Sequence, residues 1–438
     1  MGAYPRHGMY QRPLLSIVRP SPLPGTAPRG RAAREIKYDG WVDHPGYGLT
    51  PDRVVSIFRL AEQGYPQQQC DLFDDLREND ASLRNLFEGR GQAVWGKEWG
   101  LDADGTEGDS ELGAKVLDEA LRPLPMVDTL SHQLEFNPTG WACTELDWDV
   151  ATIGGRRWVV PVWFANVPAR RFRIIPETDE LRLLTTTQRT EGEALAPGKW
   201  WVTRRSAIRV ARAGLMRTAA WYALWKRYGT RDWVVFAEKF GIPLPVVKYD
   251  TTVEEQGKAV AVEIVENIGN DGGAVMPKEM EIDILKVDRS GDASGTHGGL
   301  IEFCNREMAK LINGATLSND NASGGSSYAL GEVHASVRWE SVLADAERIQ
   351  DTFRRHVAEP FMRFNGLVGR APMLEIQVVR DQSPKDILEA AAKLKNDLGV
   401  DVSVSQLRRV TGLRAPLGTS DSAPGKPVAA APAIGGAG

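Results

Sequence analysis

The feature that most constrains the fold is a single apolar stripe toward the C-terminal end of the sequence. Seven apolar residues recur at helical spacing over 331–359: Val333, Val337, Leu343, Ala346, Ile349, Phe353 and Val357. The pattern predicts one helix that ends or kinks before Pro360, because proline lacks the amide donor that a helix interior needs. At about 1.5 Å per residue this helix is about 43 Å long, which is long for a compact enzyme domain.

The segment in front of this helix is polar and carries no obvious chemistry. Residues 313–330 are rich in Gly, Ser and Asn; between Leu317 and Ala329 there is no Lys or Arg, and Asp320 is the only carboxylate. An apolar pattern over 297–312 predicts a helix before it. The segment is therefore predicted to join two helices, and loops of this length are usually functional or disordered.

The N-terminal half of the chain combines helices with strands. Thr50-Pro51 predicts a capped helix start, Asp80 can cap a later helix, and a further helix is predicted over 110–121. From about residue 141 the pattern changes to strands, in the stretches TELDWDV, RRWVVPVWFA, RRFRII, LRLLTT and KWWVT. Twelve of the thirteen tryptophans precede residue 240, which predicts the large aromatic core there. These patterns indicate an α+β fold.

The rest of the chain has weaker patterns. Residues 214–240 predict one long helix, or two helices joined at Gly229. The predictions that follow along the chain are an edge or extended segment over 242–250, a helix over 252–268, a strand over 277–287 and a turn over 291–299. Near the C-terminus, Ser383-Pro384 predicts the start of a helix that Gly399 ends, a short helix is predicted over 403–411, and the tail over 413–438 is predicted to be disordered.

Charge is distributed unevenly although the net charge is only −5. Residues 1–38 hold seven Lys/Arg against Glu35 alone, a local charge of +6, and the proline-rich stretch 1–37 predicts an extended basic arm. Residues 250–292 hold eleven Asp/Glu against four Lys/Arg, a local charge of −7. Both can be ordinary solvated surface. The longest apolar runs are shorter than the roughly 20 residues of a membrane helix, and the N-terminus shows no apolar segment of signal-peptide type.

The sequence gives little support for catalysis. Gly257-Lys258 is followed by Ala259, which rules out a phosphate-binding P-loop there, and no zinc-protease or serine-hydrolase motif occurs. Three widely spaced cysteines, Cys70, Cys143 and Cys304, form neither a disulfide framework nor a metal-ligand set. His132 and His356 lie on amphipathic patterns, where structural roles are commoner. We expect no catalytic, cofactor-binding or metal-binding residues.

Several long stretches resemble the portal proteins of Mu-like tailed bacteriophages. They are GLMRTAAWYALWKRYGTRDWVVFAEKFGIPLPVVKYD, NREMAKLINGATL and GSSYALGEVHASVRWESVLADAERIQDTFRRHVAEPFMRFNG, preceded by LTPDRVVSIFRLAEQGYPQQQCDLFDDLRENDASLRNLFEGRGQAVWGKEW and VPARRFRI. The resemblance covers roughly residues 49–412. No short motif is specific by itself; the order and spacing of the stretches carry the similarity.

The resemblance implies a ring-forming subunit with a defined order of parts. These are an N-terminal arm (1–37), an α+β wing (38–212), a first stem helix (213–240), a clip (241–296), a second stem helix (297–312), a tunnel loop (313–330), a long wing helix with its following strand (331–380), a helical crown (381–412) and a disordered tail (413–438). In this family the ring, typically dodecameric, occupies one vertex of the phage head.

The same resemblance implies the function and the partners. Double-stranded DNA would pass through the ring during packaging and ejection, and the expected protein partners are the terminase large subunit, the major capsid protein and the neck or head-completion proteins. The subunit would be in the host cytoplasm during assembly and then in the virion. The loop residues expected to face DNA are Ser318, Asn319, Asp320, Asn321, Ser323 and Ser326, and the expected docking surface of the clip is Glu279, Glu281 and Asp283.

Two other functions are compatible with parts of the sequence. The first is another oligomeric component of the phage head or neck, although neck adaptors are usually much shorter and lack a wing of this size. The second is a nucleic-acid-processing enzyme, which would need a carboxylate–metal cluster or a nucleotide-binding loop. The sequence shows neither feature, so the portal interpretation is preferred.

Overall fold

The structure is a computed structural model, and it describes residues 44–240, 246–249, 258–263, 274–277, 293–315, 328–378 and 384–398. The chain divides into two compact units, residues 1–378 and 379–438. In the second unit the described residues form one helix, α12 (Pro384–Leu398), which starts at the predicted proline. Among the described helices, none is both long enough and apolar enough to cross a membrane.

The first unit begins with three helices, and the sequence predicted the starts of the first and the third. They are α1 (Pro51–Glu62), α2 (Gln67–Asn79) and α3 (Ala81–Trp95). The Thr50 hydroxyl accepts a hydrogen bond from the amide of Arg53, and the Asp80 carboxylate accepts one from the amide of Leu83 at 3.0 Å. Both caps satisfy amide groups that have no partner inside the helix. Helices α4 (Ser110–Leu121), α5 (Met126–Gln133) and α6 (Phe136–Thr139) follow, α4 with its predicted bounds.

The predicted strand region forms two small antiparallel sheets. The first has the order β3-β2-β7, built from β2 (Trp141–Ile153), β3 (Arg156–Val167) and β7 (Trp200–Arg204). The second has the order β4-β5-β6, built from β4 (Phe172–Ile175), β5 (Glu180–Leu183) and β6 (Glu193–Ala194). Pro161 is tolerated because β3 is an edge strand and its register shifts beside Pro161. Two short 3-10 turns, Ala169–Arg171 and Val210–Arg212, complete this region.

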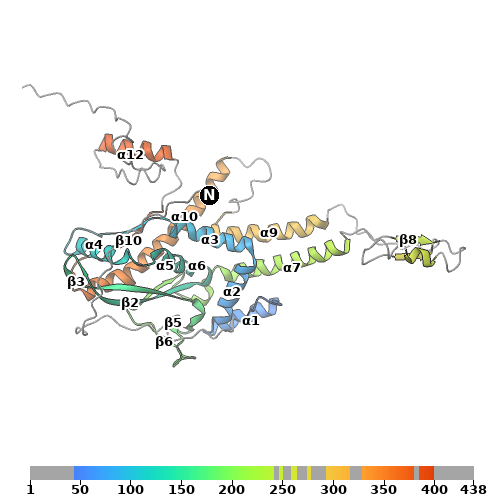
Figure 1. The fold of residues 1–438 in the computed structure, drawn as a ribbon, viewed down its shortest axis with the longest axis horizontal. Helices are drawn as coiled ribbons and strands as arrows, with labels where there is room; N and C mark the ends of the chain where they lie inside the picture. Colours follow the sequence, from blue (N-terminus) through green and yellow to red (C-terminus); the bar gives the residue numbers. More distant parts are fainter. Residues whose placement is uncertain are drawn as a thin grey trace, which may run out of the picture. The chain divides into compact units, whose positions relative to one another are not determined.

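The core of the first unit lies on both faces of β2. Alternate β2 residues point to opposite sides, so Ala142 and Leu146 join one apolar cluster while Trp141 and Cys143 join another. The first cluster also contains residues from α4, α5 and the long C-terminal helix, which Figure 1 shows alongside the sheet. Three fully buried tryptophans, Trp141, Trp148 and Trp201, confirm that the large aromatic core lies in this half.

Helix α7 (Met216–Phe240) is a single helix that passes through Gly229 without a break. It packs against α9 (Ala293–Asn313) along its length, as Figure 1 shows. The two helices are antiparallel, since Tyr222 contacts Phe303 while Phe236 contacts His297. Gly229 permits the close approach because a Cβ there would lie 3.0 Å from a methyl carbon of Leu300.

Two predictions next to α9 are wrong. The turn predicted over 291–299 is helical from Ala293 onward, so the helix expected to begin at residue 297 begins four residues earlier. Glycines at 295, 298 and 299 lower helix propensity by about 1 kcal/mol each, but packing against α7 overrides that preference. At the other end Asn313 belongs to α9, and Tyr328 already begins the next helix, so both ends of the predicted loop 313–330 are helical.

The long C-terminal helix is α10 (Tyr328–Phe353). The break predicted before Pro360 takes the form of a π turn, Arg354–Ala358, and the helical path continues as α11 (Glu359–Phe364). Pro360 therefore lies in the first turn of α11, where its missing amide proton costs nothing. Strand β10 (Met373–Ile376) then pairs antiparallel with β1 (Trp99–Asp102), the segment that follows α3.

Between α7 and α9 the structure describes three short segments. Strands β8 (Val246–Tyr249) and β9 (Ala274–Pro277) pair in parallel, and residues 258–263 are helical. The first strand agrees with the extended segment predicted over 242–250, and the short helix lies within the helix predicted over 252–268. Of the strand predicted over 277–287, only Pro277 is described, as the last residue of β9.

Candidate functional site

The predicted contact residues lie outside the described parts of the chain. This applies to the six loop residues, Ser318, Asn319, Asp320, Asn321, Ser323 and Ser326, and to the three acidic residues, Glu279, Glu281 and Asp283. The structure describes instead the two helix ends that hold the loop, α9 up to Asn313 and α10 from Tyr328. The candidate site that can be built from geometry is therefore the anchor of the loop rather than its tip.

The C-terminal end of α9 is fixed by a glycine and by burial. Gly314 has φ +73°, a left-handed conformation that ends a helix and favours glycine. Its amide donates to the carbonyl of Lys310 at 2.9 Å. A Cβ at Gly314 would lie 2.8 Å from a methyl group of Val337, so α10 passes directly over this turn. Ile312 and Ala315 on either side are buried.

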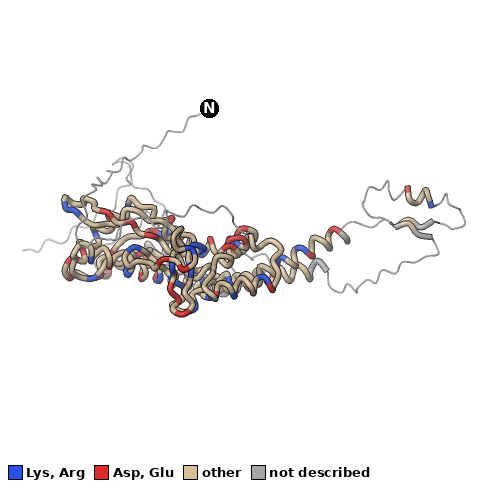
Figure 2. Tube along the Cα trace, turned by 90° about the horizontal axis from the view of Figure 1, so that it is seen from below, with Lys and Arg blue, Asp and Glu red and all other residues tan. Residues whose placement is uncertain are grey.

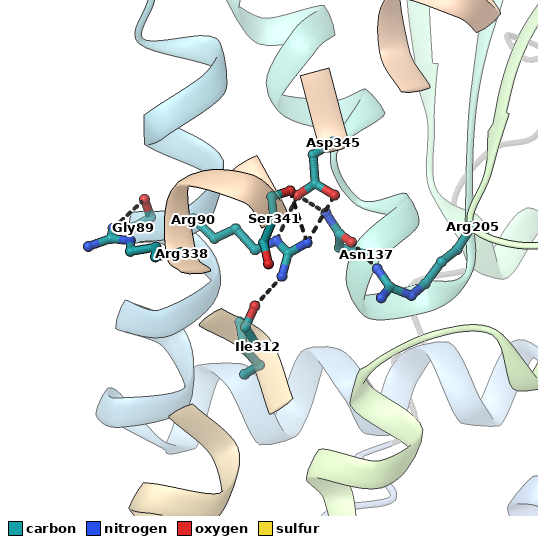
Figure 3. Close-up of polar contacts among 8 residues, drawn as sticks. All are labelled: Gly89, Arg90, Asn137, Arg205, Ile312, Arg338, Ser341 and Asp345. Atoms are coloured by element: carbon teal, nitrogen blue, oxygen red, sulfur yellow. Dashed lines mark hydrogen bonds and ion pairs between the residues drawn. The ribbon is translucent and has the colours of Figure 1, made fainter. Parts of the chain in front are cut away.

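Arg90 links this helix end to two other elements, α3 and α10. Its guanidinium, buried on α3, donates to both carboxylate oxygens of Asp345 on α10, at 2.6 and 3.0 Å. It also donates to the carbonyl of Ile312, one of the last carbonyls of α9, which have no partner inside the helix. Figure 3 shows the three groups converging on one point. The bidentate geometry fixes direction as well as distance.

Asn137 and Arg205 extend the cluster, which we call the Arg90 network (Arg90, Asn137, Arg205, Ile312 and Asp345). The Asn137 amide donates to Asp345 at 2.8 Å, and Arg205 donates to the Asn137 side-chain oxygen. Burial and then the positive charge of Arg90 lower the pKa of Arg205, against the opposing effect of Asp345. The buried carboxylate of Asp345 thus contacts Arg90 directly and Arg205 through Asn137. Removing it would leave buried charge uncompensated.

A second contact ties α10 to α3 about two helical turns before Asp345. Arg338 donates to the carbonyl of Gly89 at 3.2 Å, as Figure 3 also shows. The helix that follows the loop is therefore attached to α3 at two successive residues, Gly89 and Arg90. Both helices that flank the loop are thus fixed to the same element.

The contacts of this site hold helices in place. Its members are arginines, an amide, a carbonyl and a paired carboxylate, none of which is placed as a nucleophile or a general base. Across the described ranges no group of three or more His, Cys, Asp or Glu could hold a metal ion. His132 hydrogen-bonds the carbonyl of Cys143, and burial lowers its pKa, which fits a structural histidine. Figure 2 shows acidic and basic residues intermixed along the described elements.

The sequence did not predict the Arg90 network, although a signal was present. Arg90 falls on the apolar stripe of α3, with Leu83, Leu86, Phe87 and Val94. Asp345 lies beside Val342, Ala346 and Ile349 on the buried stripe of α10. A charged residue on a buried stripe needs a partner of opposite charge, and one Arg and one Asp in this position on two helices form such a pair.

Unlike the Arg90 network, which buries charged side chains, the surface of the α7–α9 pair exposes apolar side chains. Six large apolar side chains remain exposed there: Trp225, Trp233, Val234, Val235, Leu300 and Phe303. Trp225 and Phe303 both contact Tyr222, so exposed residues of the two helices adjoin. The pair is held to the start of α3 by Lys226, whose ammonium lies 2.8 Å from Asp80.

Comparison with known proteins identifies the class to which this architecture belongs. The family model described as the portal protein of Mu bacteriophage matches residues 70–413. The chain therefore belongs to the family of Mu-type phage portal proteins, a family of structural head components, and its mixed helix and strand content fits the α+β fold expected for it.

Two curated relatives carry matching names. The Mu-like prophage FluMu protein gp29 of Haemophilus influenzae is 28% identical over 369 residues, which cover 80% of this chain and 68% of that protein. The portal protein of Escherichia phage Mu is 29% identical over 328 residues, which cover 74% of this chain and 62% of that protein. The chain thus spans about two thirds of the length of these relatives.

Two solved structures are also similar. An HK97 family phage portal protein from Corynebacterium diphtheriae has 14% identity and a TM-score of 0.37, with 78% of this chain and 97% of that chain covered. A chain from the neck of an empty GTA particle has 14% identity and a TM-score of 0.46, with 83% and 94% covered.

Proposed function

We propose that this chain assembles into a closed ring at one vertex of a phage head, where it acts as the head-to-tail connector. The observation that carries this proposal is the exposed apolar surface of the α7–α9 pair, which includes Trp233 at 41% and Val234 at 53% exposure. Large apolar patches on a soluble protein usually mark an interaction site. In a ring, the same pair of helices from a neighbouring copy would cover them, and twelve copies is the number expected for the family.

The ring's channel would carry double-stranded DNA inward during packaging and outward during ejection. The loop between α9 and α10 is suited to line it, because the six residues Ser318, Asn319, Asp320, Asn321, Ser323 and Ser326 include no cation. Contacts of Lys or Arg with many phosphates would bind DNA tightly and in a salt-dependent way. Small polar side chains permit weak contact that is independent of DNA sequence. The Arg90 network supports this role by fixing the helices at both ends of the loop.

The acidic segment 250–292 is suited to protein docking. Glu279, Glu281 and Asp283 would face basic surfaces of the terminase large subunit during packaging and of neck or head-completion proteins afterwards. The major capsid protein would contact the α+β part of the subunit. The chain would assemble in the host cytoplasm and remain in the virion, with a structural role and no catalytic step of its own.

The test of the ring is a mass measurement on the purified protein in reducing buffer. A large closed oligomer is expected, with a central hole in negative-stain images. A stable monomer at micromolar concentration, with no larger species at any salt concentration, would refute the proposal.

The role of the loop can be tested by deleting residues 321–325. The ring and its thermal stability should persist, because the deleted segment holds no large apolar residue and surface loops tolerate length changes at a cost of about 0.6 kcal/mol per doubling. DNA packaging, or retention of packaged DNA, should fall. A control that replaces the same five residues by Gly and Ser at constant length should package normally. Normal packaging by the deletion variant would exclude the loop from the channel.

A further inference from the structure

Asn137 on α6 is the residue through which α7 joins the Arg90 network. It is 3% exposed, and three of its polar groups are bonded to three different segments. Its backbone carbonyl accepts a hydrogen bond at 2.8 Å from the amide of Leu215, the residue before α7. Its side chain donates to Asp345 on α10 and accepts from Arg205, which follows β7. Asn137 therefore connects the start of α7 to α10.

Asn137 and Arg90 meet on one oxygen atom of Asp345. The Oδ2 atom of Asp345 accepts from Arg90 Nε at 2.6 Å and from the Asn137 side-chain amide at 2.8 Å. A carboxylate oxygen offers two lone pairs, so both sites on Oδ2 are occupied. Figure 3 shows the two donors approaching the carboxylate from different sides. A carboxylate that turns toward one donor therefore turns away from the other.

Arg90 extends the same contact to the end of α9. Besides Asp345, its guanidinium donates to the carbonyl of Ile312 in the last turn of α9. Because α7 and α9 are antiparallel, the start of α7 and the end of α9 lie at the same end of the pair. Both ends thus depend on one buried carboxylate, through Asn137 for α7 and through Arg90 for α9.

The connection between Asn137 and α7 is close as well as short. A Cβ on Gly214 would overlap the carbonyl oxygen of Pro138, so the backbone of α6 lies directly against the turn before α7. Gly140, which ends α6, has φ +105°. A shift of α7 should therefore move Asn137 rather than bend the chain between them.

We propose that Asn137 is a positioning residue that couples α7 to the end of α9, and so to the base of the loop between α9 and α10. When α7 shifts, Asn137 draws on Oδ2 of Asp345, and the bond from Arg90 to the same oxygen changes in response. Arg90 in turn determines how firmly the carbonyl of Ile312 is held. This coupling lies inside one subunit, so it goes beyond the proposed function and holds whether or not the chain forms a ring.

Native-state hydrogen exchange on the full-length protein tests the coupling. Asn137→Ala should raise the exchange rate of the amides of residues 309–314, at the end of α9, roughly tenfold, because Asp345 loses a hydrogen bond that orients it toward Arg90. Amides of β2 should keep their rates, which separates a local effect from a loss of global stability.

A buried amide side chain on the neighbouring helix supplies the matched control. Gln133 on α5 is fully buried and donates to Thr144 at 2.9 Å, without a bond to Asp345. Gln133→Ala should leave the exchange of residues 309–314 unchanged. Arg205→Gln loosens Asn137 from its other side and should give a smaller rise at the same amides. It also keeps the test decisive should Asn137→Ala fail to fold.

Reversing the pair provides a rescue. Asn137→Asp sets two carboxylates against each other and should raise the exchange of residues 309–314 more than Asn137→Ala does. Adding Asp345→Asn restores one amide and one carboxylate and should recover part of the protection. The proposal is overturned if Asn137→Ala and Gln133→Ala act equally on these amides, if β2 exchanges faster by the same factor, or if the reversed pair is no better protected than Asn137→Asp alone.

Discussion

The Arg90 network and the outer surface of the α7–α9 pair adjoin the same helix, α9, yet they follow opposite rules. In the network, Arg90 and Asp345 are buried and paired with each other. Asp345 also accepts from Asn137, to which the half-buried Arg205 donates. On the α7–α9 surface, large apolar side chains such as Trp233 and Phe303 are exposed. The network buries polar groups where apolar ones are usual. The α7–α9 surface exposes apolar groups where polar ones are usual.

The difference shows which contacts the subunit completes alone. A buried ion pair with full hydrogen bonding is costly to form but even more costly to break, so it fixes one geometry. An exposed apolar surface gains free energy only when another molecule covers it. The network therefore belongs to the folded subunit, while the α7–α9 surface is suited to assembly.

The largest expected effect comes from breaking the network at Asp345. Asp345→Ala leaves Arg90 buried without its carboxylate and should lower the free energy of unfolding by about 3–5 kcal/mol. Denaturant unfolding followed by tryptophan fluorescence measures this loss. The exposed pair Arg84–Glu88, 2.7 Å apart, supplies the control, because Glu88→Ala should change stability by less than about 1 kcal/mol.

A double variant distinguishes loss of a net attraction from the cost of an unpaired charge. Arg90→Met combined with Asp345→Leu removes both charges and should be clearly less destabilising than the sum of the two single changes. Additive single and double effects would show that the two side chains act independently, which contradicts the bidentate geometry.

The second expected effect falls on assembly rather than on folding. Trp233→Ser with Val234→Ser removes apolar surface that we assign to the subunit interface. At about 1.5 kcal/mol or more per covered side chain, the dissociation constant of each contact should rise roughly 100-fold. Mass photometry across a dilution series measures the shift, while the unfolding midpoint of the subunit should stay near that of the unmodified chain.

The control for assembly uses apolar residues that lie elsewhere and are more exposed than Trp233 and Val234. Ile208 is 70% and Val368 is 72% exposed, and both lie away from α7 and α9. Ile208→Ser with Val368→Ser should leave the oligomer intact. If both double variants dissociate the ring equally, exposure alone does not locate the interface.

Much of the fold was accessible from the sequence because local signals and packing agree there. The caps at Thr50 and Asp80, the bounds of α4 and the five strand stretches are confirmed. The prediction failed where packing overrides local preference. Helix α9 begins within a glycine-rich stretch because α7 supports it. The break predicted before Pro360 is present as the π turn Arg354–Ala358.

The candidate site was less accessible, for a different reason. Arg90 and Asp345 are 255 residues apart in the sequence, and nothing local indicates which elements meet. Pairing between β1 and β10 was missed in the same way. The predicted loop and clip residues lie outside the described chain and stay predictions.

A smaller effect is expected where α9 ends. Gly314 has φ +73° and touches Val337, so Gly314→Ala should destabilise by about 1–2 kcal/mol. Gly298 lies within α9 with open space around its Cα, so Gly298→Ala should stabilise by about 0.5–1 kcal/mol. Thermal unfolding of the two variants, compared with the unmodified chain, should therefore shift in opposite directions. Shifts of the same sign would show that Gly314 is not needed for the turn that anchors the loop.

The smallest expected effect concerns the carboxylate of Asp74 on α2. Partial burial and then the carboxylate of Glu135 raise the pKa of Asp74 to about 6, from 3.8. Because the folded chain holds this proton more tightly than the unfolded chain does, the contribution of Asp74 to stability is greatest below about pH 4. It is lost as the pH rises to about 6.

Asp74→Asn removes the titration, so the stability difference between variant and unmodified chain should change in the variant's favour over this interval. Its size should be below about 1 kcal/mol, since the Asp74 side chain is exposed to solvent. Denaturant midpoints at pH 4, 5, 6 and 7 measure the difference, with the exposed residue Glu177 changed to Gln as control. A difference that is constant from pH 4 to 7 would contradict the raised pKa.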